Sequence, residues 1–260
     1  MQLVYKACIR YIHPKQKDMQ IRSLLPLCLL IFIMTTTAGF RSFYKTDKLT
    51  GAWQLQNGNQ VQMLLFMDDY VTHTSYDKTN KQFFQTNGGF YKTDNNQLTV
   101  QYEFDTKNTE RINESASYSF SIDNDQLITN INGQKMTWQR VDDGSKPLAG
   151  VWHITQRMQD EKLVPIHRTG TRKTLKILTG DRFQWVAIDP GKKEFSGTGG
   201  GNYTFENGTY TENIEFFSRD SSRVGASLSF NGKLEGKDWH HSGLSSKGDK
   251  IYEVWSKVKE

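Results

Sequence analysis

The phrases LTGAWQL (49–55) and LAGVWHI (148–154) are near copies of one another, and the stretches that follow them also match. Residues 63–104 align with residues 175–216 without a gap at a constant offset of 112, with 12 identical positions in 42. So many identities in so polar a stretch indicate an internal duplication. The chain is therefore predicted to hold two tandem modules of roughly 100 residues each, a common domain size.

The duplication continues beyond this ungapped stretch. ASYSF (116–120) matches ASLSF (226–230), and WQRV (138–141) matches WSKV (255–258). A short polar linker, DDGSKP (142–147), separates the two copies. We therefore place the first module at residues 41–143 and the second at residues 148–260, and we expect each to fold around its own core.

The first 40 residues differ in composition from both modules. Five basic residues and one acidic residue precede an apolar run, LLPLCLLIFIM (24–34), and small residues follow it at 35–39. This order is typical of a secretory signal peptide, and the run is short for a membrane-spanning helix. We expect cleavage near Ala38 and an exported product, periplasmic or extracellular; an uncleaved leader that anchors the chain in a membrane is the alternative. A start at Met19 instead of Met1 would give a more usual leader length.

The leader also accounts for the charge and the cysteines of the chain. The formal net charge is +5, but without residues 1–40 it is about +1. The apparent basicity is therefore no argument for nucleic-acid binding. Cys8 and Cys28 both lie in the leader, so the exported part has no disulfide, cysteine nucleophile or thiolate metal ligand.

Both modules alternate apolar and polar residues, and turn-forming residues interrupt them at short intervals. This pattern predicts antiparallel strands, with Asn207-Gly208 as a two-residue hairpin turn that requires positive φ. A sheet of about eight strands with one apolar face can close into a barrel that holds side chains or one small ligand. The predicted fold class is all-β, with two tandem antiparallel β-barrels after an N-terminal signal peptide.

The alternation also predicts which side chains face the inside of each barrel. In the second module Trp185 is expected to face inward, opposite His73 of the first. Inward positions on one predicted strand of the first module are Leu98, Val100, Tyr102 and Phe104, and their equivalents are Tyr210, Glu212, Ile214 and Phe216.

A family resemblance follows from the phrases that open each module. Gly51-Ala-Trp53 and Gly150-Val-Trp152 resemble the G-x-W opening of lipocalins and related calycin barrels. The second module adds GGNY (200–203), YTENIEF (210–216) and EVW (253–255), and so resembles uncharacterised secreted bacterial proteins with lipocalin-like domains nearly end to end. The resemblance implies that Trp53 and Trp152 plug the closed ends of lipocalin-like β-barrels, and it implies ligand binding more than chemistry. The first module departs from the pattern, with Val100 for Glu212 and Met136 for Glu253.

Glu212 and Glu253 are the candidate binding residues that the duplication singles out. Both are expected on an inward face where the first module is apolar. A carboxylate inside a barrel is costly unless it is paired, hydrogen-bonded or protonated. The two acids could ligate a cation, orient a polar ligand or act as an acid and base. Pairing with Arg or Lys, or exposure after a slip in strand phase, are the structural alternatives.

His241 joins these acids if Trp239 faces inward, and Trp185 and Tyr203 complete the candidate ligand-binding set. Adjacent His240 and His241 lack the same-face spacing of metal ligands on a strand, so neither a metal nor another cofactor is predicted. His73 is interpreted as a core histidine of the first barrel. The run GTGGG (197–201) precedes neither a GK[ST] motif nor a helix start, so it is interpreted as a β-bulge or strand entry and not as a phosphate loop.

The second module carries extra residues between its first tryptophan and the next shared strand. The offset rises from 99 at the tryptophans to 112 downstream, which places 13 additional residues within 156–174. This segment holds several basic side chains, among them His167 and Arg168. In a lipocalin-like barrel it would be the long first loop over the open mouth, so we expect a basic lid; a solvated loop without a role is the alternative.

Together these observations favour an exported, non-enzymatic binding protein whose second barrel holds one small-molecule ligand. The first barrel would be structural or would dock a partner. Two alternatives stay open: an enzyme that acts on a small polar or sugar-like substrate through Glu212 and Glu253, and a structural envelope protein with filled barrels. No nucleic-acid partner and no stable membrane insertion beyond the leader are predicted, and the sequence indicates neither the ligand's identity nor the oligomeric state.

Overall fold

Alternating strands joined by tight turns account for most of the chain. The computed structural model describes residues 48–131, 133–166, 170–245 and 248–258. The signal peptide predicted at residues 1–40 lies outside the described residues, together with its expected cleavage site and both cysteines. Within the described ranges, no helix is both long and apolar enough to cross a membrane.

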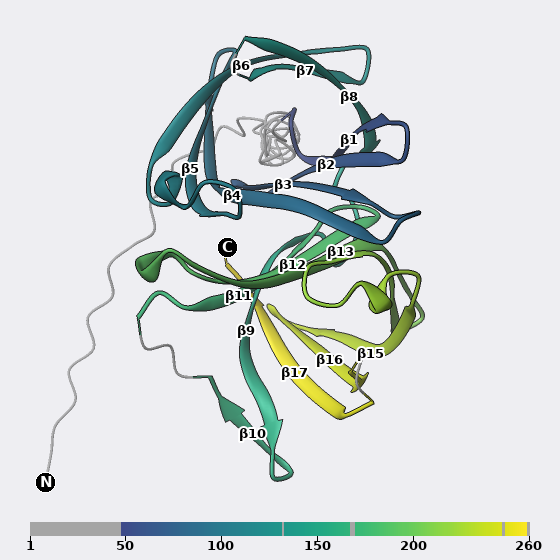
Figure 1. Ribbon diagram of the computed structural model, residues 1–260. Helices are drawn as coiled ribbons and strands as arrows, with labels where there is room; N and C mark the ends of the chain where they lie inside the picture. The colour runs from purple at the N-terminus through teal and green to yellow at the C-terminus, as the bar shows by residue number, and fades with distance from the viewer. Residues whose placement is uncertain (1–47, 132, 167–169, 246–247, 259–260) are drawn as a thin grey trace, which may run out of the picture. The chain divides into compact units, whose positions relative to one another are not determined.

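Eight antiparallel strands close the first barrel (Figure 1). Each strand pairs with the next along the chain, and β1 pairs with β8 to complete the ring. A short 3-10 helix, η1 (Thr109–Arg111), connects β5 to β6. The strands are β1 (Gly51–Asn57), β2 (Gln60–Met67), β3 (Tyr70–Asp77), β4 (Gln82–Asp94), β5 (Gln97–Asp105), β6 (Ser115–Asp123), β7 (Gln126–Ile131) and β8 (Gln134–Asp142).

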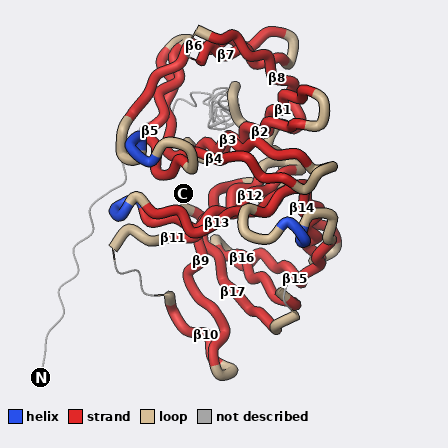
Figure 2. Tube along the Cα trace, in the orientation of Figure 1, coloured by secondary structure: helices blue, strands red, loops and turns tan. Residues whose placement is uncertain are grey.

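The second barrel repeats this arrangement with one added strand. β9 pairs with both β11 and β17 to close the ring, and β10 extends from β9 as the arm of a hairpin. Two more 3-10 helices are η2 (Pro190–Lys192) and η3 (Ser221–Arg223). The strands are β9 (Gly150–Gln159), β10 (Lys162–Pro165), β11 (Lys173–Leu178), β12 (Arg182–Asp189), β13 (Glu194–Glu206), β14 (Thr209–Phe217), β15 (Ser227–Glu235), β16 (Asp238–Leu244) and β17 (Lys250–Lys257). Figure 2 shows how fully strands dominate both rings, and the predicted all-β fold of two tandem barrels is confirmed.

Strand pairing fixes which residues of the two barrels correspond. Val100 pairs with Ala116, and Glu212 pairs with Leu228, so Ala116 corresponds to Leu228. The sequence match of 116–120 with 226–230 is therefore wrong by two residues. A shift of two leaves every side chain on the same face of its strand, so the apolar alternation could not reveal it.

The repeated glycine pair produces a β-bulge in each barrel, as predicted for the second. The pairing register shifts between Gly88 and Gly89 and between Gly200 and Gly201. The extra residue of a bulge reverses the alternation beyond it. Phe104 and Phe216 therefore do not share the inward face predicted for them, and both join an apolar cluster shared by the two barrels.

This shared cluster is the main feature of the fold that the sequence analysis did not predict. Each barrel has an apolar interior of its own, but residues 46–260 form one compact unit. The Phe216 ring lies 4.9 Å from the Tyr76 ring, centroid to centroid. Buried members from the first barrel are Ala52, Met63, Leu65, Met67, Tyr70, Tyr76 and Phe104, and those from the second are Ala149, Val151, Leu175, Ile177, Val186, Ile188 and Phe216.

Two equivalent glutamates at the bulges add polar contacts between the barrels. Glu103 accepts hydrogen bonds from Tyr70 in its own barrel at 2.9 Å and from Lys173 in the other at 2.6 Å. Its counterpart Glu215 accepts from Tyr76 of the first barrel at 2.7 Å and from Arg182 of its own at 2.9 Å. The duplicated glutamate therefore has the same role in both copies, which is to bond across the interface.

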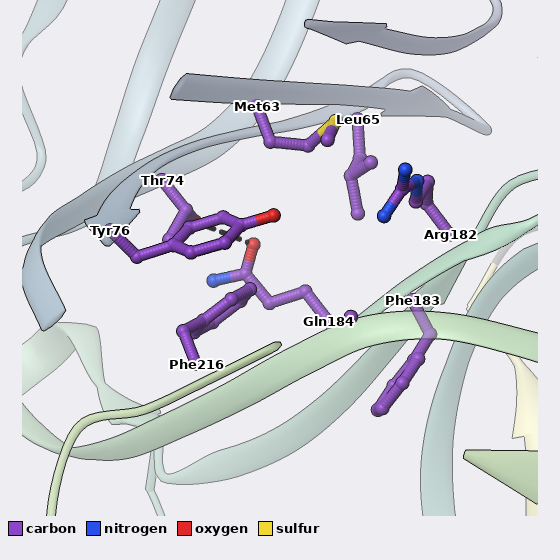
Figure 3. A pocket seen from close by; sticks show the side chains of 9 residues that line it. Met63, Leu65, Thr74, Tyr76, Arg182, Phe183, Gln184 and Phe216 are labelled. Atoms are coloured by element: carbon purple, nitrogen blue, oxygen red, sulfur yellow. Dashed lines mark hydrogen bonds between the residues drawn. The ribbon is translucent and has the colours of Figure 1, made fainter. Parts of the chain in front are cut away.

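A small pocket lies among these contacts (Figure 3). Its volume is about 10 Å³, which is room for one water molecule at most. Thr74 Oγ1 donates a hydrogen bond to Gln184 Oε1 beside it, at 2.9 Å. The pocket is a packing feature of the interface and too small for a ligand.

Candidate functional site

The interior of the second barrel contains a cavity of about 270 Å³. This volume lies just below the roughly 300–1,000 Å³ typical of ligand sites, so it suits a small molecule. Most of its wall is apolar and comes from β12, β14, β15 and β17. The apolar side chains include Trp185, Ile214, Phe217, Leu228, Phe230 and Ile251; the polar ones are Glu212, Arg223, Ser245 and Glu253.

Glu212 is held by an ion pair inside the barrel. Lys176 on β11 places its Nζ 2.7 Å from Glu212 Oε1, and both side chains are buried. Ion pairing with a buried cation is one of the structural alternatives weighed for this acid. It satisfies one carboxylate oxygen and leaves Glu212 at the wall of the cavity.

Lys176 lies among three aromatic rings. Its Nζ is 5.1 Å from the ring centroids of Tyr210 and Trp239 and 5.2 Å from that of Trp255. Ring faces attract cations at such distances, and the attraction increases where water is excluded. Burial and the negative charge of Glu212 raise the pKa of the Tyr210 phenol well above its usual value, so this group remains protonated.

Glu253 is held by two groups on β16 and β17. Its Oε2 accepts a hydrogen bond from Trp255 Nε1 at 3.0 Å and lies 3.4 Å from His241 Nδ1. Burial alone would raise the pKa of Glu253, but the contact with His241, the charge of Lys176 and the hydrogen bond from Trp255 outweigh it and lower the pKa. Burial, followed by the positive charge of Lys176, lowers the pKa of His241. Near neutral pH the site therefore contains an ionised glutamate beside a neutral imidazole.

Four buried polar atoms near these acids have no hydrogen-bond partner among the described residues. They are both ring nitrogens of His241, Trp239 Nε1 and the Tyr210 hydroxyl, and all three residues are at most 2% exposed. Buried polar atoms in native proteins are nearly always satisfied by protein, water or ligand. None of these residues lines the cavity; they surround the Lys176 ammonium and lie next to Glu253.

Of the remaining candidate residues, only Trp185 lines the cavity; His241 and Tyr203 do not. Trp185 lines the cavity, next to Phe217 at a centroid distance of 5.4 Å. His241 lies behind Glu253 and does not line the cavity itself. Tyr203 is also absent from the cavity wall, and its hydroxyl donates a hydrogen bond to the backbone oxygen of Thr179 at 2.7 Å.

Trp53 and Trp152 occupy equivalent buried positions in the two barrels. Each indole Nε1 donates a hydrogen bond of 2.8 Å to the backbone oxygen four residues earlier, that of Leu49 or Leu148. A cation covers each ring, with Arg140 Cζ 3.9 Å from the centroid of Trp53 and Lys257 Nζ 5.3 Å from that of Trp152. The barrel-plugging role that the family resemblance implies for both tryptophans stays a prediction.

The basic lid expected within 156–174 is not what the described residues form. Instead β9 runs on to Gln159 and pairs with the exposed strand β10 through a two-residue turn at Asp160 and Glu161. Both turn residues have positive φ, 48° and 59°, as a tight hairpin requires. None of the described residues of this segment lines the cavity; His167 and Arg168 lie outside the described residues.

Sequence reasoning missed two features of the site. Lys176 was not considered, although the offset of 112 aligns it with Leu64 and so replaces an apolar inward residue by a cation. Arg223 was missed because it lies on η3, outside any strand. Over the described ranges, no group of three or more His, Cys, Asp or Glu side chains is arranged to hold a metal ion.

Comparison with known proteins gives a family match for the second barrel only, and no function. Residues 147–260, which is the second barrel, match the family model described as "Domain of unknown function (DUF4488)". No curated protein matches the chain. Two closed eight-stranded antiparallel barrels in tandem fit a lipocalin-like fold, and this fold is compatible with a ligand-binding protein.

Proposed function

We propose that the protein binds a small molecule in the cavity of its second barrel, and that the first barrel supports the second through their common interface. The observation that carries this proposal is the wall of the 270 Å³ cavity. It combines apolar and aromatic surface with two carboxylates, and ligand sites typically consist of an apolar concavity with a few oriented polar groups. The matching inward positions of the first barrel hold Val100 and Met136 in place of the two acids.

The enzymatic alternative fits the electrostatics less well. A general acid at neutral pH needs a raised pKa, as in the carboxylic acids of many hydrolases. The pKa of Glu253 is lowered, and Glu212 is held by the Lys176 ammonium. Glu253 therefore lacks the raised pKa of a general acid, and one carboxylate oxygen of Glu212 is already bonded to Lys176.

Native mass spectrometry of the gently purified chain tests the proposed function. We expect a retained small molecule that a cavity-filling variant, Leu228→Trp, no longer carries, because Leu228 lines the cavity and is the equivalent of Ala116 in the first barrel. Ala116→Trp is the matched control in the interior of the first barrel, and it should retain the molecule. Equal retention by both variants, or no retained molecule in the parent chain, would count against a site in the second barrel.

We further propose that binding takes place outside the cytoplasm. Support comes from the order of basic, apolar and small residues in 1–40. N-terminal sequencing of the cell-derived protein should find a start near residue 39. An intact leader in washed membranes would contradict this.

A further inference from the structure

The charges inside the second barrel do not balance. Lys176 and Glu212 neutralise each other at 2.7 Å. Next to them the buried His241 is neutral near pH 7, because burial and Lys176 lower its pKa. Glu253 is ionised, because its pKa is lowered. At the wall of the cavity, no lysine or arginine among the described residues forms an ion pair with the Glu253 carboxylate.

Nearby arginines do not cancel this charge. Arg223 on η3 lines the cavity, but its Nε lies 3.0 Å from Asp220 Oδ2. Arg157 stands opposite Glu253 in the pairing of β9 with β17, yet its side chain is exposed. Among the described residues no ion pair joins Arg157 to Glu253. An ionised carboxylate at the wall of a largely apolar cavity is stabilised when a cation or strong donors approach it.

The polar end of the cavity presents an acceptor. Glu253 Oε2 already faces Trp255 Nε1 and His241 Nδ1, whereas its Oε1 has no hydrogen bond to any described residue. The ring of His241 lies next to this carboxylate but does not line the cavity. The occupant must therefore supply donors, and an anion would be repelled.

The apolar wall favours a cation with a hydrocarbon body. Trp185, Phe217 and Phe230 place aromatic surface along the cavity. The same barrel already holds one ammonium group among aromatic rings, that of Lys176, at 5.1 to 5.2 Å from three ring centroids. A ligand ammonium near Glu253 would meet the same combination of carboxylate and ring faces.

We propose that the cavity selects a small organic cation, an ammonium group on an apolar or aromatic body, with Glu253 as its counter-ion. This inference rests on the proposed function and specifies the class of ligand. A sugar-like ligand would supply hydroxyl donors but would leave the carboxylate charge uncompensated. An acid of similar shape would add a second negative charge.

Three probes of equal shape test the inference by calorimetric titration of the full chain at pH 7.5: 4-phenylbutylamine, 4-phenylbutanol and 4-phenylbutyrate. The amine should bind at least about tenfold more tightly than the alcohol, because a charge-assisted hydrogen bond replaces a neutral one. The acid should not bind measurably. Glu253→Gln keeps an acceptor for Trp255 and should remove the preference for the amine while alcohol binding changes little.

Met136→Gln is the control at the matched position of the first barrel, and it should leave the preference unchanged. A melting curve of each variant confirms that it is folded. Equal or tighter binding of the alcohol, binding of the acid, or a preference that survives Glu253→Gln would overturn the inference. Failure of all three probes would overturn it too. The retained molecule in the native mass spectrum reports separately on whether the second barrel binds a ligand at all.

Discussion

The two barrels share a frame and differ in their interiors. Both have a buried tryptophan at the first strand, a glycine-pair bulge and a glutamate that bonds across the interface. At four inward positions the strand register aligns an apolar or small residue of the first barrel with a charged or titratable residue of the second. Leu64 is replaced by Lys176, Val100 by Glu212, Thr129 by His241 and Met136 by Glu253.

This difference indicates that the polar interior of the second barrel is not needed for the fold. The first barrel closes with the same topology and without those charges. A buried ion pair seldom stabilises a protein more than well-packed apolar residues of similar volume. The proposed ligand site of the second barrel would account for the four residues.

The largest expected effect comes from breaking the ion pair on one side. Glu212→Gln leaves the Lys176 ammonium buried without a counter-ion, which should lower the free energy of unfolding by about 3 to 5 kcal/mol. Urea unfolding followed by tryptophan emission measures this change. A loss below about 1 kcal/mol would mean that solvent or another acid reaches Lys176.

The matched control replaces this ion pair with the apolar residue types found at the equivalent positions of the first barrel. Lys176→Leu with Glu212→Val removes both charges together and should be neutral or even stabilising, by up to about 4 kcal/mol. The converse change, Val100→Glu, should destabilise the first barrel because Leu64 offers no cation. If the double variant is as unstable as Glu212→Gln, the pair is structural and the comparison between the barrels loses its functional meaning.

A smaller effect is expected from the buried histidines on acidification. Burial is the main reason that the pKa of His73 falls to about 4 from an ordinary value of 6.5, and the pKa of His241 is also lowered. Between about pH 4 and pH 6.5 the unfolded chain binds more protons than the folded one. The contribution of the neutral histidines to stability is therefore fully present above pH 6.5 and is lost as the pH falls toward 4. His73 alone should account for about 2 to 3 kcal/mol of this loss.

Urea midpoints measured from pH 7.5 to pH 4.5 test this expectation. His73→Gln should flatten part of the profile, and His241→Thr, which restores the first-barrel residue, should flatten another part. Glu215 and Glu253 have lowered pKa values, so their contributions to stability are lost only below about pH 4.5. They therefore do not affect the profile between pH 7.5 and pH 4.5. A flat profile between pH 6.5 and 4.5 would show that both imidazoles are protonated in the folded protein.

Local sequence patterns were sufficient to predict the barrels and part of the site. Alternation combined with the 112-residue offset identified Glu212 as an inward acid, and the match of Trp255 with Trp138 identified Glu253, because these signals are local. The same offset aligned Lys176 with Leu64, so the cation was predictable in principle. The pairs across the interface were not predictable, since Lys173 meets Glu103 only after two barrels are packed together.

Other misses have identifiable physical causes. The bulge at Gly200-Gly201 adds one residue, so a strict period of two placed Phe216 on the wrong face. The hairpin at Asp160 and Glu161 lacks the usual Gly or Asn, so the segment was interpreted as a loop. In both cases the sequence pattern gives no information about a backbone conformation that the surrounding sheet imposes.

The smallest expected effect concerns Tyr203 and tests whether this residue stabilises the barrel or binds the ligand. Tyr203→Phe removes one buried hydrogen bond to the Thr179 carbonyl, which should cost about 0.5 to 1.5 kcal/mol of stability. Binding of 4-phenylbutylamine should not change, because Tyr203 does not line the cavity. Tyr91 occupies the matching buried position in the first barrel, which has no acid at the places of Glu212 and Glu253, so this tyrosine belongs to the structure that both barrels share.

Glu253→Met, which restores the residue of the first barrel, should instead weaken amine binding at least about tenfold, through loss of a charged hydrogen bond. Measured side by side, a Tyr203→Phe variant with unchanged stability and tenfold weaker amine binding would return Tyr203 to the ligand site.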